Sequence, residues 1–120
     1  MTESNRSTPP CLDHVQMRAV ATGSGGEIEV RTLFRFRQEG TIVWARYAGG
    51  AVCLGHLVGT LGPGRLEFRY VQIDLRCEVH GGRSICDVQE LPDGRLRLLE
   101  HFEWDSREGA GTNVLEQVAE

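Results

Sequence analysis

The chain of 120 residues is long enough for one folded domain with a single core and too short for two. Hydrophobic residues make up 40% of it and charged residues 25%, which is typical of a soluble globular protein. The net charge of -4 gives no electrostatic reason to expect nucleic acid or an anionic membrane surface as a partner, and no segment reaches the roughly 18 apolar residues of a membrane-spanning helix.

The start of the chain is polar. Residues 1–13 are rich in Ser, Thr, Pro and Asn and hold no apolar run that could act as a signal peptide. We therefore expect a disordered tail over residues 1–13, a single folded domain over residues 14–120, and a cytoplasmic location.

The cysteines and histidines show no metal-ligand spacing. They are Cys11, Cys53, Cys77, Cys86, His14, His56, His80 and His101. There is no CxxC pair, and Cys77 and His80 would lie on opposite faces of a strand. The glycines form neither a GxGxxG nor a GxxxxGK[ST] pattern. We therefore expect free thiols, no metal site and no cofactor.

Turn-forming residues divide the chain at intervals of roughly 10 to 18 residues, and the segments between them alternate in polarity as strands do. No segment has a helical period, and fifteen glycines argue against long helices. The predicted strands are 14–22, 27–38, 41–48, 51–61, 65–73, 78–90, 95–105 and 112–119. Eight strands with short turns predict an all-β, antiparallel up-and-down β-barrel, because closure hides the strand edges. Its interior could hold one small ligand.

The hairpin at Glu39-Gly40 orients the aromatic residues of the second and third strands. Read as a two-residue loop, it turns Phe36 and Tyr47 into the barrel. Trp44 then points outward beside Arg35, either as a cation–π pair or as part of a subunit contact. The second alternative predicts a homodimer.

The turn at Gly62-Pro63-Gly64 predicts a polar pair on the next two strands. It directs Phe68 and Gln72 inward and sets Tyr70 opposite His56. Tyr70 and His56 would be either donors that orient a carbonyl or hydroxyl group of a ligand, or a hydrogen-bonded core pair.

The clearest strand follows the turn at Pro92-Asp93-Gly94. Its inner face, apolar except at the centre, carries Leu96, Leu98, Glu100, Phe102 and Trp104. A buried carboxylate is costly unless it is paired, hydrogen-bonded or protonated, so Glu100 is either neutralised by neighbours or kept for use. The turn sets Glu100 opposite Cys86, which a neighbouring carboxylate keeps from being a nucleophilic thiolate.

The last hairpin, if centred near residue 108, sets Glu100 opposite Glu116. Facing carboxylates repel, so one should retain its proton to high pH or share it, and the pair could act as general acid and base. The alternative is that Arg46, Arg69 or a buried water neutralises both carboxylates, which then only specify the barrel.

These registers predict a polar belt across five adjacent strands, provided that a bulge at Gly81-Gly82 aligns the two halves of the barrel. The belt consists of Glu116, Glu100, Cys86, Tyr70 and His56. The belt supplies the candidate catalytic residues, which are Glu100, Glu116, Tyr70 and His56. The candidate ligand-binding residues are Cys86, Phe102, Trp104, Phe68, Gln72, Phe36 and Tyr47.

Several motifs resemble a family of small bacterial proteins that carry the label N-acetylglutamate synthase. They are Gln38-Glu39-Gly40, Ile42 to Gly50, Leu66 to Tyr70, Leu91 to Leu98, Glu100, Trp104 and Glu116. The resemblance covers about residues 27–118 and implies a compact all-β domain of calycin-like, lipocalin-like shape. Nothing resembles the acetyl-CoA loop and helix of the common acetyltransferase fold, so we interpret the label as a misannotation.

The chain departs from the family pattern at two places. Asp74-Leu75-Arg76-Cys77 replaces an Asn-Gly-type turn after Ile73, and His56 stands where the family usually has another residue. These differences imply a specialised member, for example one recruited to a biosynthetic pathway.

Two function classes follow from the barrel and its polar residues. The first is a cofactor-independent enzyme that transfers protons within a small, mostly apolar substrate, as an isomerase, cyclase or dehydratase does. The second is a binding protein with the same cavity and no chemistry. A cavity filled by side chains would instead favour a purely structural barrel.

Overall fold

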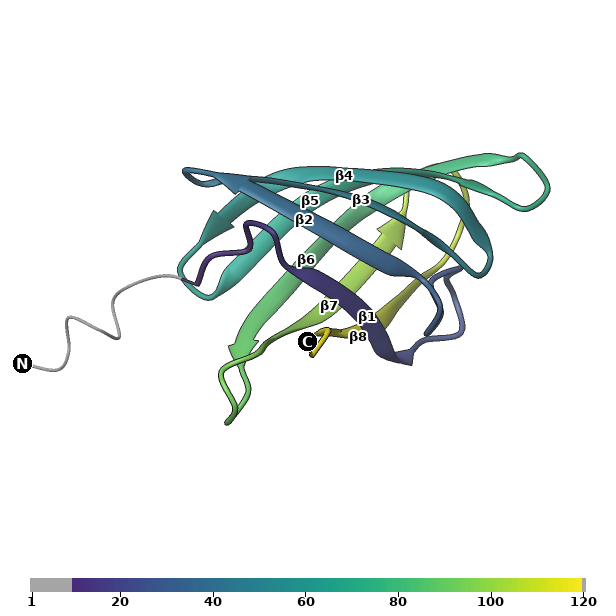
Figure 1. Ribbon diagram of the computed structural model, residues 1–120. Coiled ribbons are helices and arrows are strands. Elements are labelled where there is room, and N and C mark those ends of the chain that lie inside the picture. The colour runs from purple at the N-terminus through teal and green to yellow at the C-terminus, as the bar shows by residue number, and fades with distance from the viewer. Residues whose placement is uncertain (1–9, 120) are drawn as a thin grey trace, which may run out of the picture.

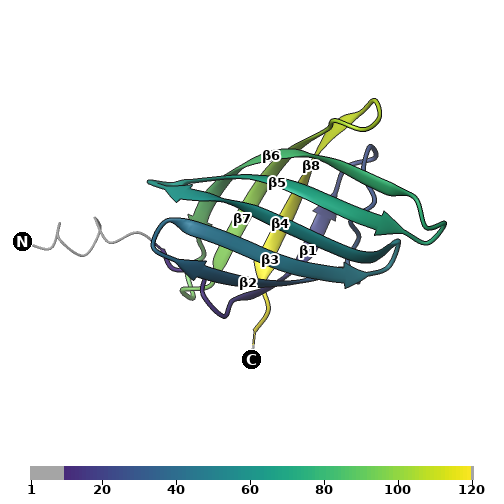
Figure 2. The same cartoon turned by 90° about the horizontal axis from the view of Figure 1, so that it is seen from above.

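The computed structural model describes residues 10–119, which form a closed antiparallel β-barrel (Figures 1 and 2). Its strands are β1 (Gln16–Thr22), β2 (Leu33–Glu39), β3 (Ile42–Gly49), β4 (Val52–Gly62), β5 (Arg65–Asp74), β6 (Val79–Glu90), β7 (Leu96–Trp104) and β8 (Ala110–Gln117). Each strand pairs with its neighbour in sequence, and β8 pairs with β1, which closes the barrel. The predicted all-β up-and-down barrel is confirmed.

Strict alternation of buried and exposed residues along each strand shows which side chains face the interior of the barrel. In β7 the buried side chains are those of Leu96, Leu98, Glu100, Phe102 and Trp104, as the sequence predicted. Successive side chains of a strand point to opposite faces, so the residues between them face the outer surface.

Along residues 10–119 no helix is long and apolar enough to cross a membrane.

The N-terminal segment closes one end of the barrel, on the left in Figure 1. The side chain of Leu12 is fully buried, and its backbone N–H donates a hydrogen bond to Gln38 Oε1 at 2.8 Å. Asp13 Oδ1 lies 2.9 Å from Arg37 Nε. Of the predicted tail, residues 1–9 lie outside the described residues, whereas Leu12 and Asp13 are anchored because the apolar Leu12 fills the barrel end.

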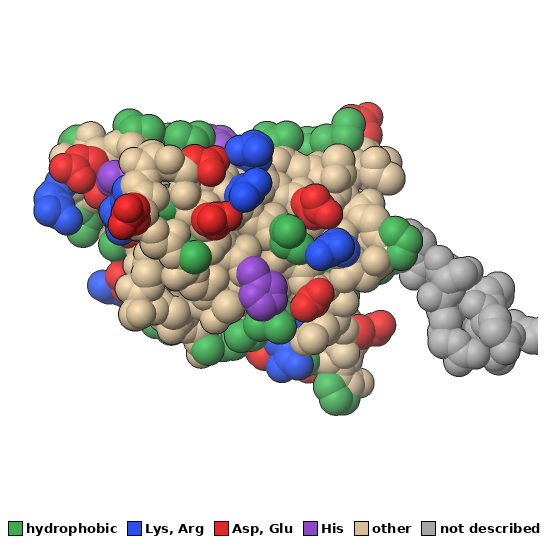
Figure 3. All heavy atoms as spheres, turned by 180° about the vertical axis from the view of Figure 1, so that it is seen from behind, with side chains coloured by type: hydrophobic (Ala, Val, Ile, Leu, Met, Phe, Trp, Pro, Cys, Tyr) green, Lys and Arg blue, Asp and Glu red, His purple; other side chains and the backbone are tan. Residues whose placement is uncertain are grey.

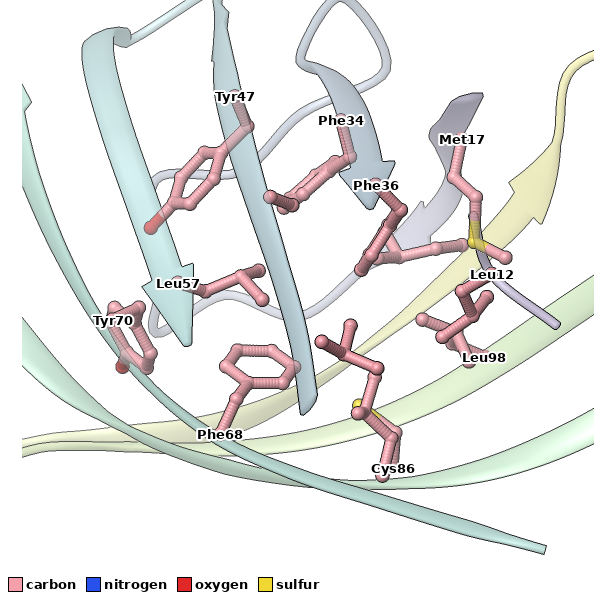
Figure 4. Close-up of a cluster of buried hydrophobic side chains, with 14 of the residues drawn as sticks. Leu12, Met17, Phe34, Phe36, Tyr47, Leu57, Phe68, Tyr70, Cys86 and Leu98 are labelled. Carbon is pink, nitrogen blue, oxygen red and sulfur yellow. The ribbon is translucent and has the colours of Figure 1, made fainter. Parts of the chain in front are cut away.

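The core begins at this closed end and continues through the barrel as one cluster of buried side chains. In Figure 4, Met17, Leu12 and Leu98 lie on one side of the cluster, and Tyr47 and Tyr70 lie on the other. Phe34 stacks on Tyr47 with ring centroids 4.6 Å apart. The tyrosine side is nearer to the open end, where the polar groups of the interior gather.

The β2–β3 hairpin turns at Gly40-Thr41, because Glu39 pairs with Ile42 and Gly40 adopts a φ of 61°. The loop lies one residue later than predicted, so each residue of β2 pairs with a β3 residue two positions further along the chain. A shift of two residues leaves every side chain on the face that was predicted for it. Tyr47 therefore points inward and Trp44 outward, as expected. Trp44 lies opposite Arg37 rather than beside Arg35.

The β4–β5 hairpin corrects the position of His56. Its loop is Pro63-Gly64, one residue shorter than predicted, because Gly62 pairs with Arg65. Tyr70 therefore pairs with Leu57, and His56 pairs with Val71 on the outer surface, where its side chain is exposed. A register change of one residue moves a side chain to the opposite face of the sheet.

The β7–β8 hairpin corrects the position of Glu116. Glu100 pairs with Asn113, three residues earlier than predicted, and Glu116 lies opposite Arg97 on the outer surface. The chain turns earlier because the N–H of Trp104 donates to the carbonyl of Gly109 at 3.1 Å, which shortens the loop. The predicted Glu100–Glu116 carboxylate pair is therefore wrong.

The β5–β6 ladder runs without a bulge, so the predicted irregularity at Gly81-Gly82 is also wrong. Tyr70 pairs directly with Gly82, where a Cβ atom would collide with the hydroxyl group of Tyr70. Glycine is needed there to make room for the phenol ring. Cys86 pairs with Leu66, four residues from Tyr70 along β5, so the five residues do not form a continuous belt.

Candidate functional site

A pocket opens at the end of the barrel opposite the closed one. It holds about 310 Å³ of space free of protein atoms, open mouth included, and it is narrow because aromatic rings crowd it. Its walls are mainly apolar and include Phe34, Leu57, Phe68, Phe102 and Trp104. The polar residues that reach the pocket are Glu27, Tyr47, Tyr70, Gln72, Glu100 and Asn113. The predicted cavity is present only as this narrow pocket, and the side chains that line it fill most of the barrel interior.

Glu100 is the buried acid of the pocket, with 5% of its surface exposed. Its Oε2 accepts a hydrogen bond from Ser84 Oγ at 2.7 Å, and its Oε1 accepts one from Asn113 Nδ2 at 3.0 Å. Gly23 N–H donates to Asn113 Oδ1 at 3.3 Å, which orients the amide so that its NH₂ group faces the carboxyl group. Two neutral donors therefore hold this carboxyl group.

Arginine does not neutralise Glu100. Within the described part of the chain, its side-chain partners are Ser84 and Asn113. Arg46 and Arg69 are exposed on the outer surface, so the alternative in which they pair with Glu100 is wrong.

Burial controls the protonation of the pocket. It raises the pKa of Glu100 above the ordinary value of 4.5, and the hydrogen bonds from Ser84 and Asn113 offset only part of this rise. Burial, and next the charge of Glu100, also raise the pKa of Tyr47 and of Tyr70, which keep their phenolic protons. The same two causes raise the pKa of Cys86, so its thiol is not a thiolate nucleophile.

A chain of hydrogen bonds connects the pocket with its mouth. The hydroxyl of Tyr47 donates to Gln72 Oε1 at 2.7 Å, and Gln72 Nε2 donates to Glu27 Oε1 at 2.9 Å. Because Gln72 is 2% exposed, its amide needs these partners. These hydrogen bonds fix the orientations of the Tyr47, Gln72 and Glu27 side chains on one face of the pocket.

A loop formed by residues 23–32, here called the mouth loop, crosses the open end. Trp104 Nε1–H donates to the carbonyl of Gly25 at 2.8 Å. A Cβ atom on Gly26 would lie 2.8 Å from the ring of Phe102, so the loop backbone packs directly on that ring. The sequence predicted a strand from residue 27, whereas β2 begins only at Leu33.

The structure brings together most of the predicted ligand-binding residues. The predicted residues that line the pocket are Tyr47, Phe68, Tyr70, Gln72, Glu100, Phe102 and Trp104. Phe36 and Cys86 are buried in the core outside the pocket lining, and His56 and Glu116 face outward.

Sequence reasoning missed Ser84, Asn113 and Glu27. Ser84 shares the inward phase of Cys86 on β6, which was the available signal. The pairing of Asn113 with Glu100 depends on the length of the β7–β8 loop, which is shorter than the sequence predicted. Glu27 lies in a loop whose path the local sequence does not predict.

A closed antiparallel barrel with a narrow, mostly apolar pocket and a few inward polar groups defines the class of calycin-type barrels. The chain matches the model of the avidin-like protein family over residues 10–118, and it belongs to that family. The calycin-like prediction is thereby confirmed, and the avidin-like barrel indicates small-molecule binding. No significant match to the chain was found among curated proteins or among solved structures.

Proposed function

We propose that this protein binds a small, mostly apolar molecule in the pocket and holds one polar group of that molecule at Glu100. The observation that carries the proposal is a buried carboxyl group facing a pocket with apolar walls. Such a pocket orients an apolar ligand through a few polar contacts.

The protonation of Glu100 selects the polar group of the ligand. Ser84 and Asn113 each donate to one of its two oxygen atoms. The proton of the acid form is then free for a ligand, and a neutral acceptor such as a carbonyl or ether oxygen suits it best. An anionic group would meet the charge of Glu100 once that residue ionised.

Filling the pocket tests the proposal. Leu57→Phe adds volume at the pocket wall, and Val58→Phe adds the same side chain on the outer face of the same strand. Native mass spectrometry should detect a co-purified small molecule on the wild type and on Val58→Phe but not on Leu57→Phe. Circular dichroism checks that both variants fold. Equal occupancy in all three proteins would rule out the pocket as the binding site.

A second candidate function is proton transfer within the bound molecule, and the elevated pKa of Glu100 favours it. The protein would then be a cofactor-independent isomerase, cyclase or dehydratase serving a biosynthetic pathway. Because Glu116 and His56 lie outside the barrel, Glu100 would donate and retrieve the proton itself, with the Tyr70 hydroxyl as the nearby polar group.

Solvent deuterium separates catalysis from binding. The ligand recovered from wild-type protein incubated in D₂O should carry carbon-bound deuterium or be converted, whereas the Glu100→Gln variant should bind the ligand and leave it unchanged. A ligand without deuterium or conversion in the wild type would leave binding alone as the function.

A further inference from the structure

We propose that Glu27, Asp74 and His80 form a binding site for a divalent transition-metal ion at the mouth of the barrel. Glu27 lies in the mouth loop, Asp74 ends β5 and His80 is near the start of β6. One ligand atom from each residue lies within 4.8 Å of the other two. These three residues are called the mouth cluster below.

Two atoms of the mouth cluster are buried without a partner. Asp74 is 4% exposed, and its Oδ2 finds no hydrogen-bond donor among residues 10–119. The same holds for Nε2 of His80, which lies 3.5 Å from that Oδ2 atom and 3.5 Å from Oε1 of the exposed Glu78. A buried carboxylate oxygen without a donor is costly, and a bound cation would satisfy it together with the histidine nitrogen.

The surrounding contacts orient all three side chains. Asp74 Oδ1 accepts the backbone N–H groups of Arg76 at 2.9 Å and Glu78 at 3.0 Å, which leaves Oδ2 for a further ligand. His80 Nδ1 lies 3.5 Å from Ser106 Oγ, so Nε2 is the nitrogen on the side of Asp74. Gln72 holds Glu27 through its Oε1 atom. Metal ligands in proteins are commonly fixed by outer contacts of this kind.

An ion pair alone accounts for the mouth cluster less well. A charge-assisted N–H···O bond is about 2.7–2.9 Å long, shorter than the 3.5 Å between His80 Nε2 and Asp74 Oδ2. Two ligands bound at about 2.1 Å to a tetrahedral ion are about 3.4 Å apart, which matches that separation. The cluster also holds two carboxylates against one histidine, while Arg107 lies 3.8 Å from the other oxygen of Glu27.

The ligand set suits Zn²⁺, because one imidazole nitrogen and two carboxylate oxygens are among its usual protein ligands. Three protein ligands leave a coordination position for water or for a donor atom of a ligand. The ion would fasten the mouth loop to β5 and β6, and Glu27 also connects through Gln72 to Tyr47 in the pocket. The sequence predicted no metal site because these residues have no regular spacing.

Isothermal titration of untagged, chelator-treated protein with ZnCl₂ tests the site. The wild type should bind one ion, and Asp74→Asn and His80→Gln should each weaken binding at least about tenfold. Asp74→Asn keeps the Oδ1 acceptor of the turn, so it removes the charge without removing the two backbone hydrogen bonds. His56→Gln, on the outer face of β4, should bind like the wild type. Cys77→Ser should do so too, although its exposed thiol lies on the same turn.

Tryptophan emission locates the ion independently of these variants. The rings of His80 and Trp104 lie 5.8 Å apart, and Trp44→Phe leaves Trp104 as the single tryptophan. Zinc should change the emission of that variant. Absence of binding at millimolar zinc, unchanged emission with zinc bound, or loss of binding in Cys77→Ser alone would overturn the proposal. If Asp74→Asn does not fold, Glu27→Gln replaces it with the same expected loss.

Discussion

At Glu100 the protein keeps a carboxyl group where water is largely excluded. Its two partners, Ser84 and Asn113, are neutral, so the local electrostatics favour the protonated form. A neighbouring carboxylate would have raised the pKa by repulsion, and an arginine would have lowered it. Here burial raises the pKa of Glu100 without a charged neighbour. The carboxyl group is therefore not part of an ion pair and can bind a ligand.

Replacing Glu100 with Gln should change how stability depends on pH. The unfolded chain ionises this residue near 4.5, whereas the folded protein keeps the proton to higher pH, so wild-type stability falls as pH rises between the two pKa values. For each pH unit of that interval, the free energy of unfolding of the wild type falls by about 1.4 kcal/mol. Glutamine can bond both Ser84 and Asn113 without titrating. Urea unfolding from pH 4 to 8 should therefore show Glu100→Gln gaining stability relative to the wild type as pH rises.

The control for this measurement is Glu103→Gln, an exposed acid on the outer face of the same strand. Its stability should follow the wild type within a few tenths of a kcal/mol at every pH, since surface ion pairs contribute little. Parallel curves for Glu100→Gln and the wild type would show that the folded protein ionises Glu100 at its ordinary pKa.

Among the larger elements, the mouth loop decides access to the pocket. It lacks the ladder hydrogen bonds of a strand and depends on contacts such as Trp104 with Gly25 and Phe102 with Gly26. Segments with few backbone hydrogen bonds open more readily than core strands. We therefore expect ligand entry through movement of this loop.

Gly26→Ala should displace the mouth loop. The added Cβ would lie 2.8 Å from the ring of Phe102, so the loop or the ring must shift. Hydrogen exchange of residues 23–32 should become faster, with a stability loss of about 1–3 kcal/mol. Gly62→Ala is the control, because a Cβ there meets nothing within 4 Å. Unchanged exchange in Gly26→Ala would mean that the loop tolerates the methyl group and does not rest on Phe102.

The outer face of β3 and β4 exposes an apolar surface formed by Ile42, Trp44 and Val58, and Val71 of β5 continues it. Hydrophobic side chains line the top of the molecule in Figure 3, where β4 runs in Figure 1. Contiguous exposed apolar residues commonly mark contact surfaces. We propose that two copies of the chain associate through this face.

Trp44→Glu should lower the association state or raise the solubility without affecting ligand binding. Light scattering after size-exclusion chromatography measures the mass, and Gln89→Glu, an exposed polar position on β6, is the control. Equal masses for the wild type and Trp44→Glu would rule out this surface as the contact.

For the whole molecule, the seam between β1 and β2 is the shortest part of the closed sheet. Their ladder joins Gln16–Arg18 to Leu33–Arg35, extended by the hydrogen bonds of Phe36 with Val15 and His14. The β4–β5 ladder runs from Val52 to Gly62 on one strand. A closed barrel opens most easily where the fewest paired groups must separate.

Hydrogen exchange should therefore be faster for the amides of β1 than for those of β5 under native conditions. Mass spectrometry of peptic fragments measures both strands in one sample, and β5 serves as the internal reference. Uniform protection around the barrel would show that the molecule opens only by global unfolding.

The strand pattern is the part that local sequence determined. Alternation of apolar and polar residues depends on neighbours two positions apart, and it correctly predicted the inner faces of β5 and β7. It also correctly predicted that Tyr47 points inward and Trp44 outward. Turn residues predicted the hairpins, and eight consecutive strands predicted the closed barrel. The buried Glu100 followed from the same alternation.

Tertiary structure decided which strands' residues meet. Loop length differs by one to three residues from the prediction at two hairpins, and period-two geometry converts an odd error into exposure on the opposite face, as for His56 and Glu116. The partners Ser84 and Asn113, and the contact of Glu27 with Asp74 and His80, depend on barrel closure and on the path of the mouth loop. These are long-range contacts, and no local pattern specifies them.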